Sequence, residues 1–269
     1  MKIFSKKRDL LKFIQREKNL GFVPTMGAIH LGHVSLIKKS LNQCNKTIVS
    51  IYINRPQFNR KTDYKKYPRV LRKDISILKK LKINYLFLPK TKLIYPDGPN
   101  RDIKINNFSK KLCGKFRPDH FVSIADVIDR FIKLIKPNKI YFGEKDMQQL
   151  KIMEHFIKKN YKDIKVVGCK TIREKSGLAL SSRNTLLSPQ EKIIASKIYK
   201  ILKETKNSLA IREVNLNYIK KKIKILGANK IDYLKILDIN KLIRPYIKKR
   251  KYRIFISYYL RQTRLIDNI

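Results

Sequence analysis

Short apolar runs and segments of helical spacing alternate along the first part of the chain. The apolar runs have the length of buried strands and lie at residues 21–25, 47–53, 85–89, 139–142 and 164–168. Apolar side chains at helical spacing lie beside them, at residues 5–19 with Ser5 as the expected cap, 34–42, 71–81, 121–134 and 147–159. Strands that alternate with helices predict βαβ units, and therefore an α/β fold with a doubly wound, Rossmann-like parallel sheet.

The pattern changes after about residue 170. The sequence Ser188-Pro189-Gln190-Glu191 is a capping box with proline at the first helical position, and it predicts a helix to about residue 204. A second helix is predicted to end near Gly227, and three β-like runs follow at residues 231–236, 253–260 and 263–266. We therefore predict a Rossmann-like domain at residues 1–170 and a smaller α+β domain at residues 171–269.

Polar side chains gather where three of the predicted strands end, which is the edge where parallel sheets bind ligands. After the first strand, His30-Leu31-Gly32-His33 leads into a helix. Unpaired N–H groups at a helix N-terminus favour phosphates, and two imidazoles beside the turn can donate hydrogen bonds to phosphate oxygens. The alternative is a plain strand-to-helix turn with two surface histidines, because short motifs also occur without function.

Further polar groups fit the same kind of ligand. Within Gly143-Glu144-Lys145-Asp146, Lys145 can offset phosphate charge, while Gln57 and Gln149 can both donate to and accept from a polar substrate. Solvated turns are the alternative for these segments. Ser181-Ser182-Arg183 can clamp a triphosphate if the second domain folds over the first, and the alternative is an ordinary loop.

Asp74 is the carboxylate that best suits a magnesium ion, which usually keeps waters and substrate phosphates as its other ligands. The alternative is an ordinary aspartate on a helix surface. No spacing of cysteine and histidine fits zinc, and the chain contains no GxGxxG loop, Walker A loop or Ser-His-Asp constellation. The chemistry is therefore expected to rest on hydrogen-bond donors and fixed charges.

The net charge is extreme, at +44 from 64 Lys and Arg against 20 Asp and Glu. Such a balance is typical of proteins that bind nucleic acids or acidic membranes. However, the basic residues are mostly lysines spread along the whole chain, and Lys, Ile, Asn and Tyr all have A/T-rich codons. We therefore attribute the charge to codon drift, with attraction of anionic substrates as a side effect that salt screens.

Cys44, Cys113 and Cys169 are odd in number and widely spaced. This usage favours reduced thiols in a cytoplasm over disulfides. No apolar stretch follows the basic N-terminus, and no run approaches the ~18 apolar residues of a membrane span. The sequence therefore predicts a soluble, cytoplasmic protein.

Taken together, these segments resemble the pantothenate synthetases, the pantoate–β-alanine ligases of the nucleotidyltransferase superfamily that contains HxGH. HxGH alone is shared by many adenylyl-transferring enzymes, whereas its combination with the other segments is highly specific. The matching segments are FVPTMGAIHLGH (residues 22–33), VSIYINRPQF (49–58), YPR (67–69), IYPDG (94–98), RPDHF (117–121), YFGEKDMQQL (141–150), GLALSSRN (177–184) and TRLIDN (263–268).

The resemblance implies ATP-dependent condensation of pantoate with β-alanine. In that reaction the pantoate carboxylate attacks the α-phosphate of ATP to give pantoyl adenylate. The β-alanine amine then attacks this mixed anhydride, and the products are pantothenate, AMP and diphosphate. No covalent enzyme intermediate is needed, so positioning and charge stabilisation carry the rate. The family also implies Mg²⁺, a homodimer, and no nucleic-acid or membrane partner.

Carried over residue by residue, the resemblance assigns catalysis to His30, His33 and Lys145, with His33 at the position of the family's proton donor. Gln57 and Gln149 match the glutamines that hold pantoate, and Gln57 also lies near the β-alanine site. Asp74 matches a position linked to magnesium. The ATP-binding set consists of Met26, Gly27, His30, His33, Gly143, Glu144, Lys145, Asp146, Ile172, Leu180, Ser181, Ser182 and Arg183. Residues 180–183 correspond to the mobile KMSKS loop of class I synthetases.

Four positions depart from the family's usual residues. Arg55 precedes Pro56, which shifts the proline of Asn-Pro-x-Gln-Phe by one place, and Cys113 replaces a glutamate. Asp119 replaces the glycine of Arg-Pro-Gly-His-Phe, and Ser123 replaces the glycine that follows this motif. If the glycine has a positive φ, aspartate tolerates it better than most residues, at some strain. None of the four carries an assigned chemical role.

Two other functions stay open on the residues alone. HxGH, the Ser-Ser-Arg segment and the net charge also suit a tRNA-binding synthetase relative, although the chain shows no anticodon-binding extension and its lysines are dispersed. Another small adenylyltransferase, acting on a nicotinate or pantetheine nucleotide, would leave Gln57, Gln149 and the second domain unexplained.

Overall fold

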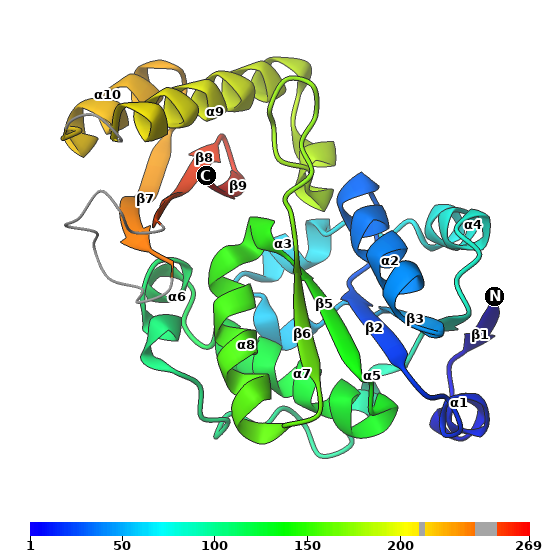
Figure 1. Ribbon diagram of the computed structural model, residues 1–269. Helices are drawn as coiled ribbons and strands as arrows, with labels where there is room; N and C mark the ends of the chain where they lie inside the picture. Colours follow the sequence, from blue (N-terminus) through cyan, green and yellow to red (C-terminus); the bar gives the residue numbers. More distant parts are fainter. Residues whose placement is uncertain (210–212, 240–251) are drawn as a thin grey trace. The chain divides into compact units, whose positions relative to one another are not determined.

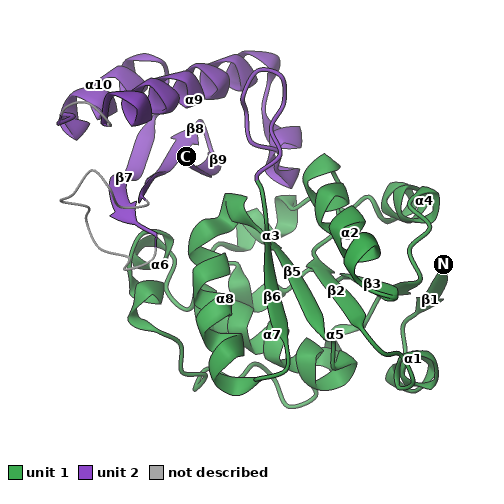
Figure 2. Cartoon of the chain, viewed as in Figure 1, with its two compact units in different colours: residues 1–170 green, residues 171–269 purple. Residues whose placement is uncertain are grey.

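The computed structural model describes residues 1–209, 213–239 and 252–269, and the chain divides into two compact units. Unit 1 is Met1–Lys170 and unit 2 is Thr171–Ile269 (Figure 2). Each unit has its own sheet, and each has its own cluster of buried apolar side chains. The two units are therefore described separately.

Unit 1 contains a six-stranded parallel sheet in the order β1-β4-β3-β2-β5-β6 (Figure 1). Its strands are β1 (Lys2–Phe4), β2 (Leu20–Thr25), β3 (Lys46–Ile51), β4 (Tyr85–Phe87), β5 (Lys139–Gly143) and β6 (Lys165–Cys169). Its α-helices are α1 (Lys7–Ile14), α2 (Leu31–Gln43), α3 (Lys61–Lys66), α4 (Leu71–Lys80), α5 (Thr91–Ile94), α6 (Cys113–Phe116), α7 (His120–Ile135) and α8 (Met147–Asn160). Short 3₁₀ helices are η1 (Arg55–Gln57), η2 (Asn107–Lys110) and η3 (Glu144–Asp146). The predicted fold class is confirmed.

Both faces of this sheet are covered, as the uninterrupted apolar strands require. Successive side chains of a strand point to opposite faces. On β2, the Phe22 ring lies 5.4 Å from the Phe131 ring of α7, whereas Val23 belongs to a buried cluster with Ile37 of α2. All of these side chains are at most 3% exposed. The helices α2 and α7 therefore pack against opposite faces, and this sandwich fixes the position of β2.

The order of the strands reverses beside β2. From β2 the chain continues to β3 and β4 on one side, whereas β5 and β6 lie on the other side. All neighbouring pairs are parallel, so the C-terminal ends of β2, β3 and β5 lie next to one another at a single edge. The crevice at such a reversal is where open α/β sheets bind ligands.

Two expectations about the N-terminus are wrong. The sequence does not predict β1, which has only three residues and pairs with β4 at the edge of the sheet. The first helix is also shorter than residues 5–19, because it starts at Lys7 with Lys6 as its cap and ends at Ile14. Ser5 follows β1 directly, so it belongs to the strand-to-helix connection.

Unit 2 is built on a three-stranded antiparallel sheet in the order β7-β8-β9. Its elements are η4 (Ser182–Leu186), α9 (Pro189–Leu209), α10 (Leu216–Ile225), β7 (Lys230–Asp238), β8 (Tyr252–Leu260) and β9 (Thr263–Asn268). The predicted capping box is present, because Ser188 Oγ accepts from Glu191 N and Glu191 Oε2 accepts from Ser188 N. Its core joins the sheet to both helices through Ile256, Ile198 and Ile223, which are fully buried.

None of the described helices of the chain is both long and apolar enough to cross a membrane.

Candidate active site

The turn after β2 carries the first group of predicted site residues. Gly27 has a φ of +80° and Ala28 a φ of +50°, so two successive residues are left-handed. A Cβ at position 27 would lie 3.0 Å from Asp74 Oδ2, so the turn needs glycine both for its conformation and for its space. Thr25 Oγ1 accepts a hydrogen bond from Gly27 N at 3.2 Å. The turn ends at His30, which is the N-cap of α2.

His30 and His33 form a pair at the start of α2, with ring centroids 4.0 Å apart. Nδ1 of His30 accepts a hydrogen bond from Gly32 N at 3.1 Å, and Nδ1 of His33 accepts a longer one from His30 N at 3.4 Å. Because each Nδ1 is an acceptor, the proton of each neutral ring belongs on Nε2. Both rings can therefore donate an Nε2–H hydrogen bond to an anion.

Both histidines are neutral at neutral pH. Burial is the main cause that lowers the pKa of His30 to about 4, the charge of Lys145 lowers it further, and Asp146 opposes the shift. Burial also lowers the pKa of His33 to about 3, with His30 and Lys145 as further causes. A positive charge at this site is consequently supplied by Lys145, while the histidines act as neutral donors.

Lys145 reaches the histidines from the neighbouring strand. It lies on η3, which follows β5, and its side chain is 19% exposed. Its Nζ lies 3.3 Å from Asp146 Oδ1. Since the charge of Lys145 lowers the pKa of both His30 and His33, its ammonium group and the two rings share one electrostatic environment. The structure thus brings the segments after β2 and β5 together, as the strand order requires.

Gln57 approaches the same turn from β3. It ends η1, and its side-chain Nε2 lies 3.3 Å from Met26 Sδ, while its Oε1 accepts a hydrogen bond from Asn54 Nδ2 at 3.1 Å. A thioether sulfur is a weak acceptor. The amide nitrogen of Gln57 is therefore the end that a carboxylate or hydroxyl oxygen of a substrate can recruit.

The Arg-Pro-Asp-His-Phe segment supports the backbone of Gln57. The carbonyl of Gln57 accepts hydrogen bonds from His120 Nδ1 at 2.9 Å and from Arg117 at 3.2 Å. Asp119 has a φ of +58°, so the left-handed conformation anticipated at this position is present. The Ser123 hydroxyl donates to Pro56 O at 3.2 Å. The Asp119 and Ser123 departures are thus both accommodated within this support.

Gln148 and Gln149 are adjacent in the first turn of α8 but differ in their surroundings. Gln148 is 5% exposed, accepts from Cys113 N at 3.0 Å, and donates to the carbonyls of Phe108 and Lys111 at 2.8 and 2.7 Å. Gln149 is only partly buried. Gln148 therefore anchors the loop before α6, and Gln149 is the member of the pair that remains suited to a substrate.

Asp74 has a structural role in the turn, and its link to magnesium stays a prediction of the resemblance. Its side chain is buried, and its Oδ2 and Oδ1 accept hydrogen bonds from Ala28 N at 2.9 Å and Ile29 N at 2.7 Å. Among the described residues, no group of three or more His, Cys, Asp and Glu could hold a metal ion. Asp74 instead binds the two N–H groups that the left-handed turn exposes, and it holds the turn in shape.

The remaining predicted ATP contacts lie in one loop of unit 2. Leu180 N donates to Ile172 O at 3.0 Å, which joins the two ends of the loop. Ser181 Oγ accepts from Arg183 N at 3.3 Å and thereby caps η4. The Asn184 side chain donates to Ala179 O at 3.0 Å. The loop that carries Ser181, Ser182 and Arg183 is therefore fixed by its own hydrogen bonds, and Ser182 is buried within it.

The family of the chain follows from comparison with known proteins. A family model described as pantoate–β-alanine ligase matches residues 2–269. The chain belongs to the pantoate–β-alanine ligase family. Pantothenate synthetase of Sulfurihydrogenibium sp. is 39% identical over 266 residues, covering 97% of this chain and 95% of the relative. Pantothenate synthetase of Clostridium botulinum strain Kyoto is 39% identical over 282 residues, covering 100% and 98%.

Solved structures of the pantoate–β-alanine ligase family share the fold. The ligase from Francisella tularensis, complexed with β-γ ATP and β-alanine, is 38% identical, with a TM-score of 0.86 and coverage of 100% of this chain and 97% of that one. The pantothenate synthetase from Thermus thermophilus is 31% identical, with a TM-score of 0.93 and coverage of 100% and 99%. The resemblance predicted from the motifs is confirmed, and the chain is an enzyme of this ligase family.

Three residues of the candidate site carry no role in the sequence prediction. Asn54 holds Gln57, Gln148 anchors a loop, and Tyr95 donates to Asn54. A signal for Asn54 exists in the sequence, because it ends an apolar run three residues before Gln57, which is about one turn of a 3₁₀ helix. Gln148 and Tyr95 act on residues more than 30 positions away, and no local pattern reveals such contacts.

Proposed function

We propose that the chain condenses pantoate with β-alanine at the expense of ATP. In the first step a pantoate carboxylate oxygen attacks the α-phosphorus, the bond to the bridging oxygen breaks, and diphosphate leaves with the electron pair. In the second step the β-alanine amine attacks the acyl carbon of pantoyl adenylate, and AMP leaves as the C–O bond breaks. The proton lost from the amine passes to solvent, and the products are pantothenate, AMP and diphosphate.

The observation that carries this proposal is the grouping of two neutral imidazole donors with one ammonium group at the reversal of the strand order. Neutral His30 and His33 can donate Nε2–H hydrogen bonds to phosphate oxygens, and Lys145 supplies the positive charge. Fixed donors and charges aimed at a developing phosphate charge need no reorganisation during the reaction, which is how such sites lower barriers. Met26, Gly27 and the Gly143–Asp146 segment complete the ATP side of unit 1 in this proposal.

Gln57 and Gln149 are proposed to hold pantoate. Gln57 is supported through its side chain by Asn54 and through its carbonyl by His120, so it is fixed before substrate arrives. A substrate carboxylate held in one orientation beside the α-phosphate gains the rate advantage of an intramolecular reaction. The position of Gln57 after β3 and of Gln149 on α8 supports this assignment, because the corresponding strands flank β2.

Unit 2 is proposed to act as a lid that adds ATP contacts from Ile172, Leu180 and the Ser181-Ser182-Arg183 segment. A guanidinium group and two hydroxyls suit a triphosphate. Closure over the nucleotide would exclude water from the mixed anhydride, which water otherwise hydrolyses.

Three further features belong to the proposal. Magnesium enters with the phosphates of ATP, since Mg²⁺ commonly takes substrate phosphates as ligands and Asp74 is engaged elsewhere. The enzyme is cytoplasmic, in keeping with three buried cysteines that form no disulfide. It is a homodimer, as expected for its family, and light scattering coupled to size-exclusion chromatography tests this point.

The proposed reaction is tested by measuring AMP release while each substrate is omitted in turn. With ATP, pantoate and β-alanine present we expect AMP and diphosphate in equal amounts, and AMP should stop when pantoate or ATP is omitted. Reactions with a nicotinate or pantetheine nucleotide in place of pantoate serve as controls for a different adenylyltransferase. AMP release that does not depend on pantoate would contradict the proposal, and tight, sequence-selective filter binding of tRNA at physiological salt would favour a nucleic-acid function instead.

A further inference from the structure

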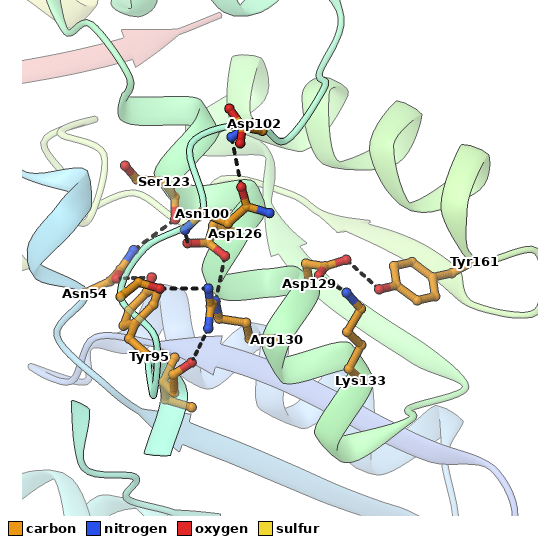
Figure 3. Close-up of polar contacts among 12 residues, drawn as sticks. Asn54, Tyr95, Asn100, Asp102, Ser123, Asp126, Asp129, Arg130, Lys133 and Tyr161 are labelled. Carbon is orange, nitrogen blue, oxygen red and sulfur yellow. Dashed lines mark hydrogen bonds and ion pairs between the residues drawn. The ribbon is translucent and has the colours of Figure 1, made fainter. Parts of the chain in front are cut away.

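The Asn54 amide is held in one orientation. Asn54 is 1% exposed, and its Oδ1 accepts a hydrogen bond from the Tyr95 hydroxyl at 2.7 Å (Figure 3). Its Nδ2 donates to Gln57 Oε1 and to Ser123 O, both at 3.1 Å. A flipped amide would turn its oxygen toward the carbonyl oxygen of Ser123, which can only accept, and would remove the acceptor that the Tyr95 hydroxyl now meets. Such mismatches of buried groups are costly, so the hydrogen-bond partners specify the orientation.

This orientation determines which end of Gln57 faces a substrate. The Oε1 atom of Gln57 is engaged by Asn54, whereas its amide nitrogen has the sulfur of Met26 as its weak acceptor. A carboxylate or hydroxyl oxygen binds to an N–H donor. The Asn54 amide therefore presents the donating end of Gln57.

The Tyr95 ring is held from the side of α7. The Arg130 guanidinium carbon lies 4.6 Å from the Tyr95 ring centroid. The same guanidinium donates to the carbonyl of Ile94 at 2.8 Å and to that of Gly98 at 2.9 Å, on either side of Tyr95 in the chain. Figure 3 shows Arg130 pointing from its helix toward Tyr95. Arg130 thus binds the loop on both sides of Tyr95.

Asp126 completes this support. One of its oxygens accepts from Arg130 Nε at 2.6 Å, and the other accepts from Asn100 N at 2.8 Å. Asp126 is 1% exposed, so its carboxylate is itself shielded from water. The carboxylate therefore holds Arg130 in position and binds the far end of the loop.

The Tyr95 hydroxyl is a donor over the whole working range of pH. Burial and the nearby charge of Asp126 raise the pKa of Tyr95, with Arg130 acting in the opposite direction. The phenol is therefore protonated, and its O–H is directed at the oxygen of Asn54.

We propose that Tyr95 is a positioning residue that fixes the amide orientation of Gln57 through Asn54, and that Arg130 and Asp126 hold Tyr95 in place for this purpose. The proposal rests on the proposed function in its assignment of Gln57 to pantoate. It predicts that a residue without contact to the substrate controls how the enzyme binds a carboxylate substrate.

Replacement of Tyr95 by phenylalanine tests the proposal because it removes only the hydroxyl. We expect the KM for pantoate to rise about tenfold, the factor that corresponds to one hydrogen bond of about 1.4 kcal/mol, while the KM for ATP stays within about twofold. The matched control is Tyr52→Phe, because the Tyr52 ring lies 6.4 Å from the Tyr95 ring and its hydroxyl is not a partner of Asn54. Equal rises in both KM values, or the same effect in the control, would overturn the proposal.

A double-mutant cycle separates positioning from a general loss of stability. In a Gln57→Ala background, Tyr95→Phe should no longer change the KM for pantoate, because the side chain that it orients is gone. Independent effects that multiply in the double variant would contradict this relay from Tyr95 through Asn54 to Gln57. Arg130→Lys provides a second test, since lysine keeps a charge beside Asp126 but lacks the planar fork whose separate nitrogens bind Asp126 and the two loop carbonyls. An unchanged KM for pantoate would again count against the proposal.

A readout without substrate distinguishes failure of the relay from failure of the proposed function. The side-chain amide NMR signals of Gln57, assigned with the Gln57→Ala variant, should shift in Tyr95→Phe and not in Tyr52→Phe. Unchanged signals would overturn the relay itself. Shifted signals with no dependence of AMP release on pantoate would instead overturn the proposed function, and with it the role of the relay in pantoate binding.

Discussion

His30 and His33 are partly buried beside an ammonium group, and that environment decides their protonation. Burial removes water from the rings, and Lys145 repels a second positive charge, so the pKa of each histidine falls well below its ordinary value of 6.5. Because both Nδ1 atoms accept backbone N–H groups, both Nε2 atoms carry the proton. The predicted proton-donor position at His33 is therefore suited to hydrogen-bond donation rather than to release of a proton from an imidazolium.

The lowered pKa values predict how stability depends on pH. In the folded state His30 and His33 take up protons only near pH 4 and pH 3, whereas in the unfolded chain they do so near 6.5. The unfolded state thus binds more protons as the pH falls below about 6.5, and the free energy of unfolding decreases, by at most about 1.4 kcal/mol per pH unit for each histidine. Partial exposure of the rings keeps the measured slope below this limit.

Urea unfolding at pH 7, 6 and 5 measures this slope, and His33→Gln is the matched variant. Glutamine at the third helical position can still accept the N–H of the cap residue, so the capping bond to His30 is preserved. We expect a clearly smaller loss of stability between pH 7 and pH 5 in the variant. Parallel slopes for the two proteins would mean that His33 titrates normally in the folded state.

Asp74 acts on the same turn through its two oxygens, which predicts a defect in Asp74→Asn that does not depend on magnesium. Asparagine keeps one acceptor but turns an NH₂ group toward the N–H of Ala28 or Ile29, which costs about 1–3 kcal/mol. We expect at least a tenfold lower kcat/KM for ATP. The Mg²⁺ concentration for half-maximal AMP release should stay unchanged, and a large increase in it would identify Asp74 as a metal ligand after all.

The sequence points to candidate site residues, but it does not reveal the contacts that hold them in place. His30, His33 and Lys145 stand out because they follow strand ends in motifs. Asp74 carries no such sign of its structural role, since its partners lie 45 and 46 residues away along the chain. The sequence shows that a carboxylate is present, and only the packing of α4 against the turn shows that both of its oxygens accept backbone hydrogen bonds.

At the scale of elements, most strands and helices predicted from a long apolar period lie close to their expected bounds, and the first helix is an exception because it is shorter. Strand β1 is not predicted at all, because its three residues are too few to show an alternation of apolar and polar side chains. The loop at residues 172–184 is a different case, because it has no period at all. Its form depends on Arg173, which forms two hydrogen bonds of 2.6 and 2.8 Å with Asp267 of β9 and also donates to Gly177 O.

Asp267→Asn should loosen this loop. The Arg173 and Asp267 side chains are 16% and 10% exposed, and a charge-assisted pair of this kind contributes about 1.5–3 kcal/mol. We expect a loss of about 2 kcal/mol in the free energy of unfolding and a higher KM for ATP, since the loop carries the predicted ATP contacts Ser181 and Arg183. Chemical denaturation and initial-rate kinetics measure the two effects, with Asp163→Asn, outside unit 2, as the control. A destabilised variant with an unchanged KM for ATP would separate this loop from ATP binding.

At the scale of the whole molecule, the sequence has 64 basic residues against 20 acidic ones. In the described part of the chain, well-buried ion pairs include Arg130–Asp126, Arg173–Asp267 and Arg264–Asp232. The attraction within such an ion pair acts only locally, whereas the repulsion among the excess lysines acts over the entire surface. Repulsion among like charges destabilises a compact chain, and salt screens it beyond about 8 Å at physiological ionic strength. The net charge therefore lowers stability without changing the fold that the apolar pattern specifies.

This repulsion predicts that salt stabilises the protein. Between 50 and 500 mM NaCl we expect the Tm to rise by several degrees, because each kcal/mol shifts the Tm of a domain of this size by roughly 2–4 °C. Lys145→Ala tests whether the effect is global, since anions bound at the candidate site would stabilise only the protein that keeps the charge proposed to bind phosphate. Equal slopes of Tm against salt in both proteins would identify surface repulsion as the cause. A Tm that falls with added salt would show that local ion pairs outweigh the excess positive charge.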